Sequence, residues 1–313
     1  MKIKLMPCIL AARRIFGAEA FVGGLLLLSL DGRAQNLFVA DGYNSKIYEY
    51  TPGGVQSTFA SGLSYPVGLA FDSTGNLYEA DNGSGSIYEF TPGGVRTTFA
   101  SGLVLPYSLA FDSSGNLFVG TYGGSAKIIK ITPRGVQSTF ASGLSYATGL
   151  AFNSAGVLFE SDMGSKHIYE FTANGAKTSY ASGNFQPTGL AFDSGSDLYV
   201  GDALNKVIYK IDLSFNVTTI ASGLKLPLGL ALDNTGDLYA SEIQGDDVIK
   251  ITSGGARSIF AFGSFVPYGI AFEPQAAPEA STGELFGLGL CSLFVWQRRF
   301  GADSSKSTNS KRG

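Results

Sequence analysis

Few residues of this chain have the types and spacing that catalysis or metal binding requires. The chain contains one histidine, His167, which excludes a multi-histidine metal centre. A histidine-activated nucleophile would also need a positioned serine and an orienting acid, and most serines recur at repeated, structural positions. The one place where three carboxylates follow each other closely is Glu242, Asp246 and Asp247, which are weak candidates for a metal site. We predict no catalytic residue, although a carboxylate pair for glycoside cleavage stays open because a sequence does not give the distance between side chains.

The amino-acid composition excludes several classes of protein. The two cysteines, Cys8 and Cys291, lie near the ends, so no disulfide framework and no zinc spacing is present. The chain has 42 Gly, 15 Tyr and 23 Phe but only 15% charged residues, which indicates many short strands joined by tight turns. Residues 36–273 carry 12 Lys and Arg against 20 Asp and Glu, a balance of -8 that argues against binding nucleic acid.

The elements that must position any site are six sequence repeats. The segment Gly68–Asp72 recurs with starting points 40, 41, 40, 40 and 40 residues apart. Its partners are Ser108–Asp112, Gly149–Asn153, Gly189–Asp193, Gly229–Asp233 and Gly269–Glu273. Each repeat also holds three more strand-forming runs, such as Leu77–Asp81, Ile87–Phe90 and Thr98–Gly102. Four strands in about 40 residues, repeated six times, predict an all-β fold, a six-bladed β-propeller with four-stranded blades.

The order of the runs also predicts how the ring closes. The first repeat lacks its first strand, because the repeats begin at Asn36 with the second type of run. The last copy of the first strand, Gly269–Glu273, stands at the other end of the repeats. We therefore expect this C-terminal strand to join the N-terminal blade, so that no blade is left with an unpaired edge.

The segments Pro66–Asp72, Gly75–Asp81 and Ile87–Phe90 resemble the NHL repeat and the wider superfamily of gluconolactonase-like and strictosidine-synthase-like propellers. The resemblance covers residues 36–273 and implies the fold, which hosts hydrolases, lyases, receptors and scaffolds. In gluconolactonase-like hydrolases, Asn or Asp often precedes the innermost-strand glycine and ligates a divalent cation in the channel. The corresponding residues here are Val67, Tyr107, Thr148, Thr188, Leu228 and Tyr268. Because none is a carboxylate or an amide, we expect no cofactor; calcium is expected only if the chain is an enzyme of this superfamily.

Two sets of loops share one end of such a propeller. The set that precedes the innermost strands carries the predicted ligand-binding residues: Tyr65, Tyr107, Tyr146, Phe185, Phe265 and Tyr268. A tyrosine offers a flat apolar face to a sugar ring and a hydroxyl to its edge, so we expect a glycan or another weakly polar ligand. The alternative is that these aromatic residues only pack between neighbouring blades.

The second set of loops joins the second strand to the third. It begins with Asp41, Asp81, Thr121, Asp162, Asp202 and Glu242. We expect these acidic side chains to cap the following turns through hydrogen bonds to the backbone. The alternative is an anionic ring that attracts cations. The loop after Thr121, residues 122–127, lacks the acid and holds one extra residue.

Both ends of the chain resemble export signals. Residues 1–34 have basic residues, an apolar run from Phe21 to Leu30 and then Gly32-Arg33-Ala34, the order of a secretory signal peptide cleaved after Ala34. The alternative is an uncleaved anchor. The propeller then spans 35–273, and residues 274–313 form a linker and a tail.

In that tail, residues 278–282, the apolar run from Leu285 to Trp296 and Arg298-Arg299 resemble the PEP-CTERM sorting signal of bacterial exported proteins. The resemblance implies an exosortase-type processing enzyme as a partner. The alternative is an incidental apolar tail.

These observations predict an exported, non-catalytic propeller of the bacterial cell envelope, cell surface or extracellular space. It would bind a glycan or a protein, or serve in surface or matrix structure, with the membrane contacted only through the terminal segments. One alternative is an extracytoplasmic enzyme of the lactonase or lyase type, and another is a repeat expansion with little function beyond stable folding.

Overall fold

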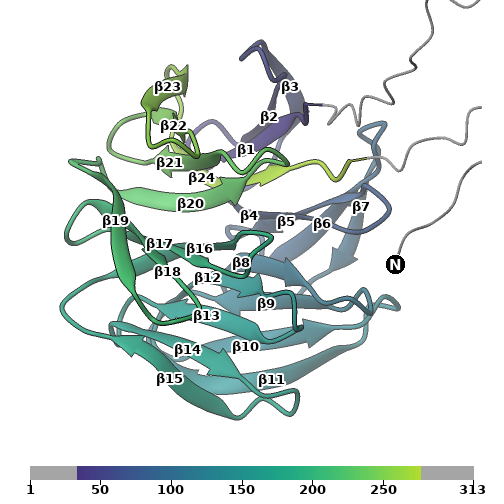
Figure 1. The fold of residues 1–313 in the computed structure, drawn as a ribbon. Coiled ribbons are helices and arrows are strands. Elements are labelled where there is room, and N and C mark those ends of the chain that lie inside the picture. Colours follow the sequence, from purple (N-terminus) through teal and green to yellow (C-terminus); the bar gives the residue numbers. More distant parts are fainter. Residues whose placement is uncertain (1–33, 276–313) are drawn as a thin grey trace, which may run out of the picture. The chain divides into compact units, whose positions relative to one another are not determined.

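The computed structural model describes residues 34–275, which form six four-stranded antiparallel sheets (Figure 1). This confirms the predicted all-β, six-bladed propeller. Within this range there is no helix, and therefore none that is long and apolar enough to cross a membrane. Residues 1–33 of the predicted signal peptide (1–34) and residues 276–313 of the predicted linker and tail (274–313) lie outside the described residues.

Each blade is a meander of four neighbouring strands, ordered from the central channel outwards. Blade 1 contains β24 (Pro267–Phe272), β1 (Leu37–Asp41), β2 (Lys46–Tyr50) and β3 (Gln56–Ser61). Blade 2 contains β4 (Pro66–Phe71), β5 (Leu77–Asp81), β6 (Ser86–Phe90) and β7 (Arg96–Ala100). Blade 3 contains β8 (Pro106–Phe111), β9 (Leu117–Thr121), β10 (Ala126–Ile131) and β11 (Gln137–Leu144). Blade 4 contains β12 (Ala147–Phe152), β13 (Leu158–Asp162), β14 (His167–Phe171) and β15 (Lys177–Ser182). Blade 5 contains β16 (Pro187–Phe192), β17 (Leu198–Asp202), β18 (Val207–Ile211) and β19 (Val217–Ser222). Blade 6 contains β20 (Pro227–Leu232), β21 (Leu238–Glu242), β22 (Asp247–Ile251) and β23 (Arg257–Phe262).

The hydrophobic core lies between the blades, because a four-stranded blade is too small to bury its own faces. The ring of Phe38 on β1 stands edge-on to Phe59 of its own blade, at 4.9 Å, and to Phe71 of blade 2, at 5.1 Å. The same three-ring arrangement recurs around Tyr78, Phe118, Phe159 and Tyr239. A Phe or Tyr at the same position of the second strand thus joins five of the six blades to the next blade.

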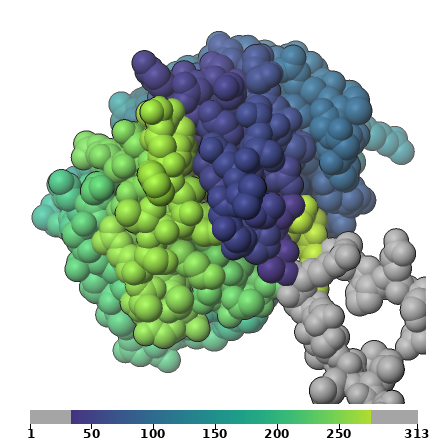
Figure 2. Space-filling view, turned by 90° about the horizontal axis from the view of Figure 1, so that it is seen from above, coloured from purple at the N-terminus to yellow at the C-terminus, as the bar shows by residue number. Residues whose placement is uncertain are grey.

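The ring closes as the order of the repeats predicted. β24 pairs with β1 in antiparallel register, with Leu37 opposite Phe272 and Val39 opposite Ile270. Beyond this pairing, the backbone N–H of Glu273 donates to the carbonyl oxygen of Asn36 at 3.2 Å. Figure 2 shows the consequence: the first strands, in purple, lie directly beside the last strands, in yellow-green. Blade 1 therefore contains both ends of the repeat region.

The innermost strands approach one another so closely that they need glycine. A Cβ atom added to Gly68, Gly149, Gly189 or Gly269 would overlap a backbone carbonyl oxygen of the neighbouring blade. Blade 3 has Ser108 instead, whose hydroxyl donates to the carbonyl oxygen of Ala147 in blade 4, at 3.1 Å. The close approach leaves only a narrow central channel.

Candidate ligand-binding site at the channel mouth

Two sets of loops meet at one end of the channel, as the sequence predicted. In five of the six blades, the backbone N–H of the first residue after the second strand donates to a carbonyl oxygen of the loop that enters the innermost strand. Examples are Tyr122 to Leu105 at 2.9 Å, Met163 to Tyr146 at 3.1 Å, and Ala203 to Gln186 at 3.0 Å. These hydrogen bonds fix the two loops of each blade against each other, so side chains from both sets share the mouth.

The acidic residues at the ends of the second strands cap these loops. Asp202 is fully buried, and its Oδ1 accepts hydrogen bonds from the backbone N–H groups of Gln186, Leu204 and Asn205, at 3.0–3.2 Å. Asp162 binds the loops of blade 4 in the same way, through the N–H groups of Ser145, Tyr146 and Ser165. This confirms the capping role. These carboxylates hold the loops in place and do not form an open anionic ring.

Five tyrosines gather at the mouth, and we call them the tyrosine arc: Tyr65, Tyr107, Tyr122, Tyr146 and Tyr268. The rings of Tyr107 and Tyr122 are stacked, with centroids 4.9 Å apart and an interplanar angle of 25°. The ring of Tyr122 lies 4.7 Å from that of Tyr146. Tyr65 and Tyr268 contact each other through their hydroxyls, with ring centroids 5.2 Å apart. Four of the six predicted ligand-binding residues thus lie together.

The backbone at Tyr65 adopts a conformation that is unusual for an aromatic residue. Its φ of 63° falls in the left-handed region, where glycine and asparagine are the common residues. Leu105 and Leu226, at the same position of blades 3 and 6, have φ values of 47° and 64°. Such a conformation costs free energy and tends to occur at functional loops, because the surrounding structure must impose it.

Tyr122 was not among the residues predicted from sequence. It follows Thr121, where the other five repeats have an acidic residue, and it begins the loop that holds one extra residue. Thr121 caps this loop through a single hydrogen bond, from the N–H of Lys127 to its Oγ1 at 2.9 Å. The sequence marked the loop as individual, and its one aromatic side chain was the available signal.

The structure places Phe185 and Phe265 in the core and not at the mouth, which corrects the prediction for these two residues. Phe265 is 3% exposed and packs among Leu37, Val39 and Tyr50. Phe185 packs against the core between blades 4 and 5. The reason is a shift of one residue: both phenylalanines fill the position that a leucine, such as Leu63 or Leu144, fills in the other four blades. For these two residues the alternative, packing between blades, is correct.

The channel below the arc is a cavity of about 80 Å³. Of the six residues that precede the innermost-strand glycines, five line it: Val67, Tyr107, Thr148, Leu228 and Tyr268. Thr148 and Thr188 direct their hydroxyls to the neighbouring blade, donating to the carbonyl oxygens of Pro187 at 3.0 Å and Pro227 at 2.8 Å. The lining of the cavity therefore contains no side-chain carboxylate that could ligate a cation, and the threonine hydroxyls are already hydrogen-bonded to backbone carbonyls.

The phenols of Tyr107 and Tyr268 stay protonated, because their pKa values are raised. Burial raises the pKa of Tyr107 well above its ordinary value, and the neighbouring phenols of Tyr268, Tyr122 and Tyr65 add to this effect. The pKa of Tyr268 is also raised, by burial first and then by its hydrogen bond with Tyr65. The mouth therefore presents the neutral hydroxyls of Tyr107 and Tyr268 together with aromatic faces, which suit an uncharged ligand.

Of the three carboxylates predicted as weak metal candidates, Glu242 and Asp247 lie opposite each other on β21 and β22, but the three do not form a metal site. Glu242 is fully buried, accepts a hydrogen bond from the backbone N–H of Lys225 at 2.7 Å and pairs with Arg257 at 3.2 Å. Asp247 lies 3.6 Å from the Lys225 ammonium, and Asp246 is exposed in the turn. Between residues 34 and 275, no three His, Cys, Asp or Glu side chains are grouped so that they could hold a metal ion.

His167 is also outside the channel. It begins β14, the third strand of blade 4, and its ring stacks on Tyr169 with centroids 5.2 Å apart. Its Nδ1 lies 2.7 Å from the carbonyl oxygen of Ser165. This histidine is part of the blade surface and contacts no member of the arc.

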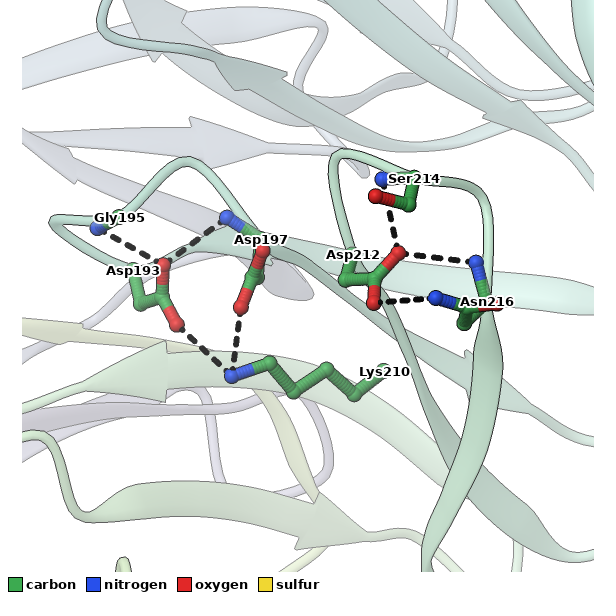
Figure 3. A network of polar contacts seen from close by, with 7 residues as sticks. All are labelled: Asp193, Gly195, Asp197, Lys210, Asp212, Ser214 and Asn216. Atoms are coloured by element: carbon green, nitrogen blue, oxygen red, sulfur yellow. Dashed lines mark hydrogen bonds and ion pairs between the residues drawn. The ribbon is translucent and has the colours of Figure 1, made fainter.

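The opposite end of the propeller is polar, and its charges are paired locally. In blade 5, Lys210 reaches Asp197 at 2.8 Å and Asp193 at 3.2 Å, and Figure 3 shows both bonds. The Oδ1 of Asp193 accepts from the backbone N–H groups of Gly195 and Asp197, so the same residue shapes its turn and binds the lysine. Lys250 repeats this arrangement in blade 6. The lysines of these two blades are thus held by the carboxylates of their own turns.

Comparison with known proteins identifies the fold. No protein-family model matches this sequence, and no curated protein is detectably similar to it. A chain in the crystal structure of a nidogen/laminin complex is 21% identical, with a TM-score of 0.70 over 78% of this chain and 100% of that chain. A gluconolactonase from Xanthomonas campestris is 17% identical, with a TM-score of 0.60 over 66% of this chain and 79% of that chain.

A third similar structure is that of a lyase. It is a catalytically inactive histidine-to-alanine variant of virginiamycin B lyase from Staphylococcus aureus, with quinupristin. It is 19% identical, with a TM-score of 0.53 over 76% of this chain and 81% of that chain. At these identities the three proteins share the propeller fold with this chain, and the fold alone does not define an activity.

Proposed function

We propose that this chain is an exported, non-catalytic binding propeller of the bacterial cell surface or envelope, and that the tyrosine arc is its glycan-binding site. The observation that carries the proposal is the arc itself, five tyrosines at one mouth of the channel. Aromatic faces stack on the apolar faces of sugar rings, and the phenol hydroxyls donate to ring substituents.

The charges around the mouth favour binding over catalysis. The carboxylates beside the arc, such as Asp162, are saturated by backbone N–H groups and are therefore unsuited to proton transfer. The ring of His167 stacks on that of Tyr169, on the third strand of blade 4. For the lyase, loss of one histidine gives a catalytically inactive protein. The single histidine of this chain, His167, is not among the residues that line the channel cavity.

The test is retention of the full exported protein on a panel of neutral and charged polysaccharides. We expect Tyr122→Ala and Tyr146→Ala each to weaken binding about 2- to 12-fold, from the roughly 0.5–1.5 kcal/mol of one aromatic contact. Tyr43→Ala is the matched control, because Tyr43 is 79% exposed at the same end but outside the arc. Unchanged retention in both arc variants would remove the arc from the function.

Two other outcomes would redirect the proposal. Calcium-dependent hydrolysis of a lactone would favour the enzyme of the gluconolactonase type. Capture of a defined surface protein with no glycan bound would favour a protein ligand, as in the nidogen/laminin complex. Export itself is tested by sequencing the N-terminus of the mature protein, which we expect to be Gln35, and by its location in the host.

A further inference from the structure

Two tyrosines of the arc are in direct contact although they are far apart in the sequence. Tyr65 lies in the loop that leads from β3 into β4, and Tyr268 lies on β24, 203 residues later. Their hydroxyls touch, and their rings are tilted by 60° with centroids 5.2 Å apart. Tyr65 is 43% exposed, so solvent and small reagents reach this pair.

Tyr65 and Tyr268 lie on either side of the point where the propeller ring closes. The chain between the two residues forms blades 2 to 6, so a bond between them would enclose five of the six blades in one covalent loop. In the native chain β24 is joined to blade 1 only by strand pairing and packing. Residues 34–275 contain no cysteine, so no disulfide within the described propeller strengthens this closure.

We propose that Tyr65 and Tyr268 are a site of oxidative tyrosine cross-linking that closes the propeller ring covalently. The co-reactant is a peroxide together with a one-electron oxidation catalyst of the peroxidase class. Each phenol gives up one electron and its hydroxyl proton, and the peroxide takes up both electrons and both protons to become two molecules of water. The two phenoxyl radicals then form a carbon–carbon bond between ring positions next to their hydroxyls. The ring hydrogens at those positions move to the oxygens and restore both phenols.

The geometry selects this pair among the exposed tyrosines. The radical must meet a second phenol before it reacts elsewhere, and these two hydroxyls are already in contact. Tyr107 and Tyr122 stack face to face at 25°, with no hydroxyl–hydroxyl contact in the described part of the chain. Tyr43 is more exposed, at 79%, but contacts no other aromatic ring there, so it couples only between molecules.

The experiment treats the full purified protein with hydrogen peroxide and a haem peroxidase at low protein concentration. We expect a monomer that has lost two hydrogens, dityrosine fluorescence, and one cross-linked peptide pair containing Tyr65 and Tyr268. Closing a loop of about 200 residues restricts the unfolded chain, so we expect the melting temperature to rise by about 10 °C or more.

Conservative variants separate the proposal from random oxidation. Tyr65→Phe and Tyr268→Phe remove only a hydroxyl, and each is expected to abolish both the cross-link in the monomer and the rise in melting temperature. Tyr43→Phe is expected to leave both unchanged and to lower the yield of cross-linked dimers. The proposal is overturned if the monomer carries no cross-link, if the cross-link persists in Tyr268→Phe, or if it forms without raising the melting temperature.

Discussion

Replacing two buried glutamates by valine is expected to stabilise the propeller. Glu79 and Glu160 are 0% exposed, and neither oxygen of either carboxylate has a hydrogen-bond partner among the described residues. They occupy the middle of β5 and β13, facing the preceding blade. The other four repeats place apolar residues at this position: Val39, Val119, Val200 and Ala240.

The size of the expected stabilisation follows from the absence of hydrogen-bond partners for these two carboxylates among the described residues. A buried polar group without a hydrogen bond costs about 1–3 kcal/mol, and valine fills the same position in three other blades without that cost. We therefore expect Glu79→Val and Glu160→Val each to raise the free energy of unfolding by about 1–3 kcal/mol. For a domain of this size, this corresponds to a rise in melting temperature of about 2–12 °C. The two sites lie in different blades, so their effects should add.

The same carboxyls determine a pH dependence. Burial raises the pKa of Glu79 well above its ordinary value; Asp81 adds to the shift and Arg96 opposes it. Burial, Asp162 and Lys177 act on Glu160 in the same way. Because the folded state binds these protons more tightly than the unfolded state, their contribution to stability is complete below the ordinary carboxyl range. It is lost as the pH rises towards the folded-state pKa values.

The assay is thermal unfolding of the full protein between pH 4 and pH 8, with the double valine variant beside the native chain. We expect the native protein to lose stability with rising pH and the double variant to lose less. The Glu79→Gln, Glu160→Gln variant is the control, since it removes both titrations but keeps buried polar groups and should gain little stability at low pH. A double valine variant that melts at or below the native temperature at neutral pH would refute the reasoning.

Three further outcomes are expected. Gly189→Ala should lower the free energy of unfolding, measured with urea, by about 1–3 kcal/mol or more. The added Cβ would lie 2.9 Å from the backbone nitrogen of Leu230 and closer still to a carbonyl oxygen. The control is Gly124→Ala, which should leave the free energy of unfolding unchanged because no atom lies within 4 Å of its Cβ. Ending the chain at Gly263 removes β24 and should cause the protein to aggregate, which light scattering measures. A truncated protein that stays soluble and melts at the same temperature as the parent would contradict the ring closure. Lys210→Met should lower stability by at most about 1 kcal/mol at low salt and by less at high salt, because its partners are partly exposed.

The fold was predictable because the repeats encode it locally. Each run of strand-forming residues ends in a turn whose hydrogen bonds involve its own neighbours, as when Asp72 accepts from the N–H groups of Thr74 and Asn76 at 2.9 Å. Six copies of four such runs allow few arrangements, and the missing first strand of repeat 1 identifies its replacement. The capping role of the acidic strand ends was predictable for the same reason.

The candidate site was predictable only in part. Tyr65, Tyr107, Tyr146 and Tyr268 occupy repeat positions that face the mouth, so their loops identified them. Phe265 is displaced because the loop of its blade is shifted by one residue, which moves the ring into the core. A sequence repeat of 40 residues does not reveal a shift of one residue within a loop. An apolar side chain takes the position in which it is buried.

The number of blades, the strands of each blade, the closing strand and the type of loop at the mouth follow from the amino-acid sequence, since they depend on patterns that repeat. Which side chains meet follows from tertiary packing. It brought Tyr122 into the arc and placed the hydroxyls of Tyr65 and Tyr268 in contact. It also left the carboxylates of Glu79 and Glu160 without a hydrogen-bond partner among residues 34–275. These contacts join different strands and blades, and their distances follow from the packing of the ring around its channel, which no local pattern in the chain expresses.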